Sequence, residues 1–530
     1  METQSMTKRT DQLRARMNAG FPLLLAGAAL LVVSNGRWIL PLATWLYSVF
    51  LVRYVRTAPK LWKGLAATYL VFFVTMPILW LGLWPFPPLV MAKMAAMTAA
   101  YSVVPYLLDR LSESRIRGVA QTLVFPTSAV ALEFLFTLRL SQTTWGNLAY
   151  TQTENLPLLQ LASIAGIWGI TFVMLWLAPV ANNLWRSGWS DGRARAGVAV
   201  YGLVLGAVVL FGSSRLVFFA PSGGSFRAAS VTPPEILDVA SPEDLQPIQQ
   251  IMMKQEVDEA QAANVRAILE STYERLFEDT RREARAGADL VVWPEGALVS
   301  FDEERDEALI EQGRKLASEE EIYLAMTIAL LPGASGGPNE NRLILISPAG
   351  EVVQTYWKHH TVPVIEEPFA LAGSERPFVH KTDSTALGGV ICYDMDSPRF
   401  MRSAGRDGVD VLLAPSGDWP AIKELHSRMA LVRAVEQGFS LVRPANHGLN
   451  LVTDYQGRVL GRLDHYATSD RRLSAAVPER GVTTVYQRTG DALPWLCLAL
   501  TVLFLALLLR HRARPRRSSA TATGSSRSPS

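Results

Sequence analysis

The fold of the second half of this chain is decided by the stretch LGGVICYDMDSPRFMRSAGRDGVDVLLAPSGDW, residues 387–419. It begins and ends with apolar runs of the length of buried β-strands, and the segment 397–408 between them has the pattern of a short helix closed by Gly408. The first run stops at Cys392, where a turn-like Tyr-Asp-Met-Asp-Ser-Pro sequence follows. Taken alone, Cys392 is best explained as a small core residue, because free cysteine is among the most buried residue types. The alternative is a nucleophile at the end of a strand.

Strand-like and helical segments surround this unit on both sides. The further predicted strands are 226–233, 288–298 and 322–331, the predicted hairpins are 341–363 and 439–463, and the predicted helices are about 252–287 and 421–438. Strands that alternate with helices, with hairpins interposed, indicate an α/β domain with α-β-β-α layers.

Apolar runs dominate the first 220 residues and return near the carboxyl end. A hydrophobic fraction of 49% and a mean hydropathy of +0.16 exclude an ordinary soluble enzyme. Runs long enough to cross a bilayer predict eight spans, at about 20–35, 38–53, 64–84, 87–108, 119–138, 158–185, 197–219 and 491–510. The first run also resembles the apolar part of a signal peptide, but further spans follow at once, so we expect an uncleaved helix.

The connecting loops differ in positive charge, and this predicts an orientation. Lys and Arg concentrate in alternate connections, at 8–16, 53–63, 110–117, 186–195 and 510–517. The other loops carry almost none, and cytoplasmic loops are the positive ones. We therefore expect both termini in the cytoplasm and residues 225–485 on the outer face of the membrane. Within the spans, Glu133 and Lys93 are either interfacial residues or part of a lipid-access cavity.

These patterns predict four regions along the chain. They are a membrane domain at 1–224 with about seven transmembrane helices, an extracytoplasmic domain at 225–485, a transmembrane helix at 486–512 and a disordered basic cytoplasmic tail at 513–530. The net charge of +3 is too small to indicate a nucleic-acid partner. The two cysteines do not make a disulfide framework, and Cys497 lies inside an apolar run, so no bridge to Cys392 is expected.

Three predicted strands end in a reactive side chain: Glu295, Lys358 and Cys392. Open α/β sheets bind ligands at such strand ends. A thiol needs a base or a cation nearby to attack at neutral pH, which Glu295 could supply as base, while Lys358 could stabilise an oxyanion. Alternatively, Glu295 starts a helix and Lys358 is a solvated edge lysine. His359 and His360 are adjacent on a strand and so point to opposite faces, and we predict no metal site there.

The same three segments resemble the nitrilase (carbon–nitrogen hydrolase) superfamily. The matching residues are Pro294-Glu295 after a strand, Lys358 in Lys-His-His-x-Val-Pro, and Cys392 in Val-Ile-Cys-Tyr. The lysine motif, the layout of the spans and the stretch 426–459 are similar to the apolipoprotein N-acyltransferases. The resemblance implies a nitrilase-like α-β-β-α sandwich with a Glu-Lys-Cys catalytic triad.

The resemblance also implies a reaction and its setting. Cys392 would take an acyl chain from a phospholipid as a thioester and pass it to the α-amino group of the diacylglyceryl-cysteine that begins an apolipoprotein. Glu295 would be the base, Lys358 the oxyanion stabiliser and Glu366 a second essential glutamate. Asp394 stands where the family usually has Glu, which marks this position as one where donor and acceptor preference can differ. The enzyme would need no cofactor and would act as a monomer in the bacterial inner membrane, with its catalytic domain on the periplasmic face.

Other functions remain as alternatives. A membrane-anchored nitrilase-type amidase would use the same three residues with water as the acceptor. A transporter with a regulatory outer domain would need several charges or broken helices in the membrane, and the spans contain few. A non-catalytic scaffold would lack a member of the triad, and all three residues are present.

Overall fold

The computed structural model describes residues 20–84, 86–141, 143–234, 250, 258–331, 338–363, 366 and 373–513. The amino-terminal basic stretch, the tail from residue 514 on and the start of the predicted helix 252–287 lie outside the described residues.

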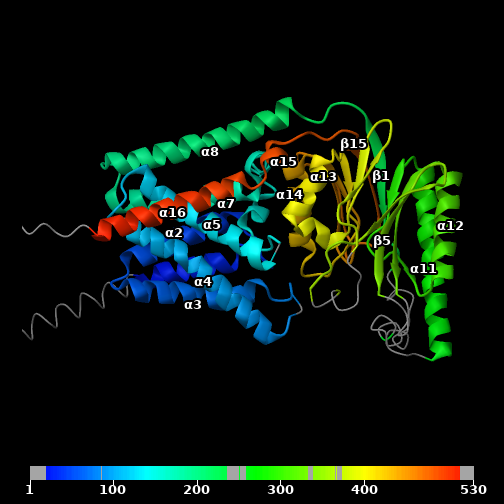
Figure 1. The fold of residues 1–530 in the computed structure, drawn as a ribbon, viewed down its shortest axis with the longest axis horizontal. Helices are drawn as coiled ribbons and strands as arrows, with labels where there is room; N and C mark the ends of the chain where they lie inside the picture. The colour runs from blue at the N-terminus through cyan, green and yellow to red at the C-terminus, as the bar shows by residue number, and fades with distance from the viewer. Residues whose placement is uncertain are drawn as a thin grey trace, which may run out of the picture.

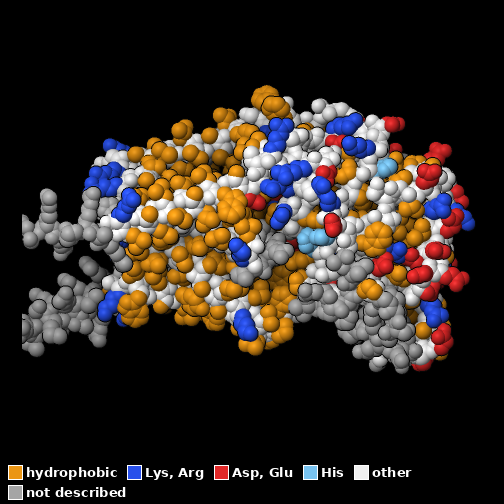
Figure 2. Space-filling model, viewed as in Figure 1, with side chains coloured by type: hydrophobic (Ala, Val, Ile, Leu, Met, Phe, Trp, Pro, Cys, Tyr) orange, Lys and Arg blue, Asp and Glu red, His pale blue; other side chains and the backbone are white. Residues whose placement is uncertain are grey.

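A helix lies at each of the eight predicted spans. They are Gly20–Val32, α2 (Pro41–Thr57), α3 (Leu61–Leu79), α4 (Pro88–Ser112), α5 (Val119–Phe136), α7 (Ala162–Ser187), α8 (Gly192–Phe218) and α16 (Ala492–Ala513). Five of the described helices, namely α3, α5, α7, α8 and α16, are long and apolar enough to cross a membrane. The chain is a multi-pass membrane protein, and the bundle's side chains form a broad apolar belt in Figure 2.

The two ends of the helical bundle differ in their contacts. At one end, Arg56 of α2 is paired with Asp109 of α4 at 2.7 Å, and Arg186 of α7 reaches Glu113 at 2.6 Å. We call the domain that follows the first seven of these helices the outer domain, because it lies outside the helical bundle. At the other end of the bundle, the indole of Trp419 in this outer domain donates a hydrogen bond to the carbonyl of Gly82, at 3.1 Å. The outer domain therefore rests on the end of the bundle opposite to the Arg-rich loops (Figure 1).

Two sheets form the centre of the outer domain. The first has the order β15-β1-β2-β4-β5-β6, with β3 paired to β4, and the second has the order β14-β13-β11-β9-β8-β7. The first sheet contains β1 (Ser225–Val231), β2 (Leu290–Val292), β3 (Leu298–Ser300), β4 (Tyr323–Leu330), β5 (Glu340–Ile346), β6 (Val352–Trp357) and β15 (Arg472–Pro478). The second contains β7 (Phe378–Lys381), β8 (Ala386–Gly389), β9 (Val411–Leu413), β11 (Ser440–Arg443), β13 (Leu449–Thr453) and β14 (Val459–Asp464), and β10 (Ser416–Gly417) pairs separately with β12 (Ala445–Asn446).

Helices cover the outer face of each sheet. Along β4, Leu324 and Met326 face the core beneath α11 (Glu259–Arg285) and α12 (Glu303–Glu319), whereas Ala325 faces the second sheet. This alternation follows from the period of two in a strand. On the other side, α13 (Pro398–Arg406) and α14 (Lys423–Gln437) cover the second sheet. The predicted α-β-β-α fold class is confirmed, and Figure 1 shows the layers in this order.

The apolar core does not stop at the outer domain. One continuous cluster of buried residues includes Leu412 of β9 and Met429 of α14 together with Val130 of α5 and Trp168 of α7. Helix α14 contacts both the second sheet and α7, so it lies between the sandwich and the bundle. The two halves of the molecule thus share one core.

Candidate active site

Glu295 lies in the turn between β2 and β3. Thr327 of β4 holds this turn, since its hydroxyl donates to the carbonyl of Pro294 and accepts the backbone N–H of Ala297. The carboxylate of Glu295 accepts two further bonds, from Nδ2 of Asn341 at 2.7 Å and from the backbone N–H of Gly417 at 2.8 Å. These bonds fix both oxygens of a carboxylate that is close to the second sheet.

Lys358 follows β6, and its ammonium lies between two carboxylates. Nζ is 2.7 Å from Oε1 of Glu295 and 2.7 Å from Oε1 of Glu366, and the side chain is 3% exposed. Burial alone lowers the pKa of an ammonium, but Glu295 and Glu366 outweigh it and hold the pKa of Lys358 well above its usual value. Lys358 therefore stays charged at neutral pH.

Glu366 is held by the turn that follows Lys358. Its Oε2 accepts the backbone N–H of Val362 at 2.8 Å, and its own N–H donates to the carbonyl of Val362 at 2.9 Å. Burial raises the pKa of Glu366, and the nearby Lys358 opposes that rise.

Cys392 follows β8 and begins a 3-10 turn over Cys392–Asp396. Its φ of 49° lies in the left-handed region that residues with a side chain rarely adopt, and such strain is common at functional sites. The backbone N–H of Cys392 donates to the carbonyl of Pro415 at 2.8 Å, and the thiol donates to the carbonyl of Gly417 at 3.6 Å. Burial, followed by the charge of Glu295, raises the pKa of Cys392 well above its usual value, so the resting group is a thiol.

Asp394 is completely buried, and its described hydrogen bonds go to groups other than Glu295, Lys358 and Cys392. Its Oδ2 accepts the Tyr356 hydroxyl at 2.7 Å and the backbone N–H of Ile391 at 3.0 Å, and its Oδ1 accepts the backbone N–H of His360 at 2.7 Å. The neighbouring His359 stacks on Phe400, with ring centroids 4.8 Å apart. Asp394 therefore ties the cysteine turn to the end of β6.

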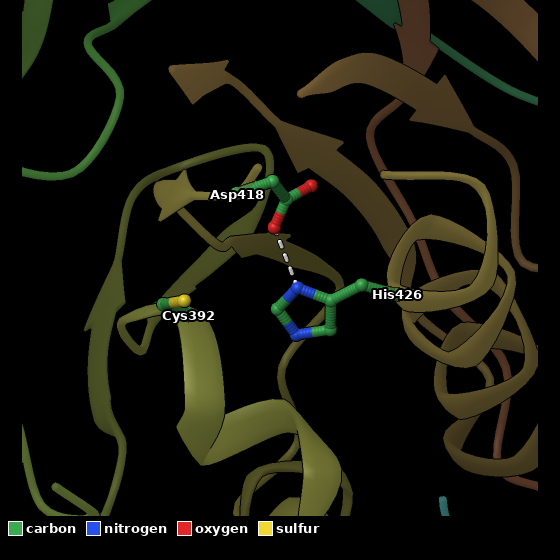
Figure 3. A group of neighbouring side chains, drawn as sticks. All are labelled: Cys392, Asp418 and His426. Atoms are coloured by element: carbon green, nitrogen blue, oxygen red, sulfur yellow. Dashed lines mark hydrogen bonds and ion pairs between the residues drawn. The ribbon is translucent and has the colours of Figure 1, made fainter. Parts of the chain in front are cut away.

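Cys392 also belongs to a cluster that the sequence analysis did not predict. The side-chain sulfur, oxygen and nitrogen atoms of Cys392, Asp418 and His426 lie within 4.8 Å of one another. Figure 3 shows the side chain of His426 extending from α14 toward the other two. Nδ1 of His426 is 2.7 Å from Oδ1 of Asp418, and Nη2 of Arg443 lies 2.9 Å from the same oxygen. His426 and Asp418 are therefore already paired with each other and with a guanidinium, and this donor set does not fit a metal ion.

The charges of this cluster depend on each other. Burial lowers the pKa of His426, but Asp396 and Asp418 outweigh it and raise the pKa to about 9. Burial would raise the pKa of Asp418, but Arg443 and His426 hold it below its usual value. At neutral pH, His426 is an imidazolium between two carboxylates.

A cavity of about 430 Å³ leads from the membrane bundle to the cysteine turn. Its lining is mainly apolar and includes Phe72, Met76, Trp145, Pro363 and Tyr393, the last directly after Cys392. Glu133 also lines it and accepts a hydrogen bond from Nδ2 of Asn147 at 2.8 Å, whereas Lys93 is exposed on α4. Of the two polar residues noted within the spans, Glu133 is the one that lines the cavity.

Comparison with known proteins agrees with this arrangement in both halves. Residues 21–180 match the apolipoprotein N-acyltransferase N-terminal domain, and residues 248–473 match carbon–nitrogen hydrolase. The chain belongs to the apolipoprotein N-acyltransferase family.

The relatives span most of the chain. A protein named apolipoprotein N-acyltransferase from Geobacter metallireducens is 27% identical over 498 residues, which cover 85% of this chain and 86% of the relative. One from Rhodopseudomonas palustris is 26% identical, covering 80% and 78%. An amidase from a Nesterenkonia species is 21% identical, with a TM-score of 0.38, and covers 52% of this chain and 96% of its own. The pairing of the strands and the match to carbon–nitrogen hydrolase agree with a nitrilase-like fold.

All the predicted site residues are described in the structure, and two further residues, Asp418 and His426, lie beside Cys392. Lys358 contacts both Glu295 and Glu366, the Gly417 peptide links Glu295 to Cys392, and Asp394 is bonded to Tyr356 instead. Sequence analysis missed Asp418 and His426. The available signal was that Gly417-Asp418, like Cys392, ends an apolar run.

Proposed function

We propose that this chain is an apolipoprotein N-acyltransferase that transfers an acyl chain from a phospholipid to the α-amino group of a diacylglyceryl-cysteine. Membership of the family supports the reaction class. The observation that carries the proposal is the group of Glu295, buried Lys358 and buried Cys392 beside an apolar cavity of the membrane bundle. A water-soluble substrate would not need such a cavity.

In the first step, Glu295 takes the thiol proton of Cys392, and the sulfur attacks the carbonyl carbon of the phospholipid ester. Two of the three N–H donors of Lys358 are bonded to Glu295 and Glu366, and we assign the third to the developing oxyanion. When the carbon–oxygen bond breaks, the proton on Glu295 passes to the leaving glycerol oxygen. The products are a lysophospholipid and a thioester on Cys392.

In the second step, the neutral amine of the apolipoprotein attacks the thioester carbonyl. Glu295 accepts a proton from the attacking nitrogen, the carbon–sulfur bond breaks, and the sulfur recovers its proton from Glu295. The thioester divides ester-to-amide transfer into two easier steps. Glu366 has no direct part here and holds the ammonium of Lys358 in place.

The setting of the reaction follows from the two ends of the bundle. Arg56, Arg110 and Arg186 meet at the end away from the outer domain, and Figure 2 shows Lys and Arg gathered there. Positive loops are cytoplasmic. These charges support our proposal that the outer domain lies on the periplasmic face of a bacterial inner membrane and both termini in the cytoplasm. We further propose that the chain acts as a monomer.

Mass spectrometry of the acceptor tests the reaction. Membranes that contain the protein are incubated with phospholipid and a synthetic diacylated lipopeptide with a free amino terminus. We expect the peptide to gain the mass of one acyl chain, and we expect Cys392→Ala to abolish the gain. The control is Cys497→Ala, which removes the other cysteine, buried in α16. A gain that persists in Cys392→Ala would refute the proposal.

The same assay separates the transferase from a nitrilase-type amidase. An amidase would hydrolyse an amide to a carboxylic acid and ammonia or an amine, and it would leave the mass of the lipopeptide unchanged. Lys358→Ala should lower the acylation rate of Cys392 by roughly 10²–10³-fold, as for loss of an oxyanion donor.

A further inference from the structure

His426 contacts two segments that form the surroundings of Cys392. It enters from α14, with a side chain that is 3% exposed. Its Nδ1 lies 2.7 Å from Oδ1 of Asp418, and its Nε2 lies 3.3 Å from Oδ1 of Asp396. Nη2 of Arg443 also lies 2.9 Å from Nδ1. The two carboxylates outweigh the burial of the ring and this guanidinium, and they raise the pKa of His426 so that the ring is cationic at neutral pH.

The positive charge of His426 balances the charges of the buried groups around it. The charged groups around the ring are Asp396 of the cysteine turn, Asp418 after β10, and Arg443 of β11, and Cys392 is the nearby thiol. Two carboxylates are matched by one guanidinium and one imidazolium. A neutral side chain at 426 would leave a buried negative charge unpaired, which is costly.

Through Asp418, His426 holds the backbone of Gly417, which contacts both Glu295 and Cys392. Gly417 precedes Asp418, donates its N–H to Glu295 at 2.8 Å and accepts the Cys392 thiol on its carbonyl at 3.6 Å. A Cβ at Gly417 would lie 3.2 Å from Oε2 of Glu295, so the peptide has little room to move on this side. Anchoring the Asp418 carboxylate therefore fixes the group that holds both reacting side chains.

The Asp396 side of His426 reaches the membrane domain. Oδ2 of Asp396 accepts the indole N–H of Trp145 at 2.6 Å, and the ring of Trp145 lies against that of His426, with centroids 5.6 Å apart. Trp145 also lines the apolar cavity. The contacts therefore run without a break from the cavity through Asp396 and His426 to Asp418.

We propose that His426 is a positioning residue for acyl transfer, which holds the Gly417 peptide through Asp418 and the cavity wall through Asp396 and Trp145. The inference rests on the proposed function for its substrates. It assigns His426 no contact with the substrate and no transfer of a proton. The contact with Asp418 should affect kcat, and the contact with Asp396 should affect the KM for phospholipid.

The test compares His426→Gln, Asp418→Asn and Asp396→Asn, with His380→Gln of β7 as the matched histidine control. Steady-state acyl transfer gives kcat and the KM for phospholipid, and iodoacetamide reports the alkylation rate of Cys392 in a Cys497→Ala background. We expect His426→Gln and Asp418→Asn to lower kcat and alkylation together by roughly 10–100-fold, the scale of a misplaced reacting group. Asp396→Asn should mainly raise the KM for phospholipid. His380→Gln should match the wild type.

A pH profile separates positioning from a loss of folded protein. Wild-type kcat should contain a falling limb near pH 9, where His426 loses its proton, and His426→Gln should lack that limb. Folded His426→Gln with wild-type kcat and alkylation would overturn the proposal. If His426→Gln does not fold, Asp418→Asn decides, because unchanged alkylation in that variant also overturns it. Alkylation needs no lipid substrate, so this result is independent of whether the lipopeptide is acylated.

Discussion

At the scale of single residues, Asp394 shows how the structure changes the meaning of a substitution. From the sequence, Asp394 in place of the usual Glu marks a position where substrate preference can differ. In the structure, its carboxylate is directed toward Tyr356 and the backbone of His360. Tyr356 lies in β6 of the first sheet, and Asp394 lies in the turn after β8 of the second sheet. Their hydrogen bond therefore joins the two sheets. We interpret Asp394 as a residue that positions Cys392 and does not contact substrate.

Replacing Asp394 with Ala should therefore affect stability and geometry together. The change leaves a buried hydroxyl and two backbone N–H groups without an acceptor, and each such group costs about 1–3 kcal/mol. We expect a loss of about 3 kcal/mol or more, seen as a lower thermal midpoint, and slower alkylation of Cys392. The control is Asp407→Ala, because Asp407 pairs only with the exposed Arg376 among its described contacts. An Asp394→Ala protein as stable as that control would contradict the interpretation.

The charge of His426 makes stability depend on pH. Its pKa is raised from 6.5 to about 9 in the folded protein. The resulting stabilisation is fully present below pH 6.5 and is lost as pH rises through about 9, and its upper limit is about 3 kcal/mol. We expect the thermal midpoint of the wild type to fall between these pH values more steeply than that of His426→Gln. Parallel pH curves for the two proteins would show that the ring is neutral when folded.

At the scale of elements, a break in α7 forms the joint between the two halves. Gly166 has a φ of 63° inside the helix, and the freed backbone N–H of Ile167 donates to Oε1 of Glu436 in α14 at 2.8 Å. Glu436 is in turn paired with Arg433, whose guanidinium also donates to the hydroxyl of Tyr150. The break in α7 thus frees a backbone N–H that binds the buried carboxylate of Glu436 in α14.

Gly166→Ala should weaken this joint. A Cβ there would lie 2.5 Å from Cε2 of Tyr486 and 3.1 Å from Oε1 of Glu436, and the positive φ adds strain. We expect a cost of about 2–4 kcal/mol from overpacking and backbone strain, measured by thermal unfolding and by faster proteolytic separation of the two halves. The matched control is Gly202→Ala in α8, where no atom lies within 4 Å and a helical alanine is favoured. Equal stability of the two variants would contradict the prediction.

The elements also show how far the sequence could predict this fold. The hairpin at 341–363 is confirmed as β5 and β6, because Pro348-Ala349-Gly350 is a strong local turn signal. Helix α12 and strands β7 and β15 were not predicted. The partner of β15 is β1, which precedes it by more than two hundred residues, and no local pattern identifies such a pairing.

The site was predictable only in part for the same reason. Glu295, Lys358 and Cys392 each end a local apolar run, so the sequence marks them one by one. Asp418 comes beside Cys392 because β9 lies next to β8 and β10 contacts the Cys392–Asp396 turn. His426 does so because α14 contacts the same turn. These are long-range contacts, and they cannot be inferred from the spacing of the residues along the chain.

At the scale of the whole molecule, the orientation in the membrane can be tested directly. In a Cys392→Ala, Cys497→Ala background, a single cysteine is placed at exposed Asp383 of the outer domain or at exposed Ser190 between α7 and α8. An impermeant maleimide should label Asp383→Cys in intact cells whose outer envelope has been opened. Ser190→Cys should be labelled only after the inner membrane is disrupted. The reverse pattern would contradict the predicted orientation.

The shared core has a consequence for how the chain can be divided. The change of composition near residue 225 suggests a cut between an anchor and an enzyme, yet the buried cluster runs from Val130 and Trp168 to Leu412 and Met429. A fragment released at that point would carry the bare apolar side of α14 into water and would lose Trp145 from beside His426. We therefore predict that proteolysis near residue 225 releases no active soluble enzyme. If Cys392 is the proposed nucleophile, we predict that it acts only at the bilayer surface and that esters elsewhere in the cell envelope are out of its reach.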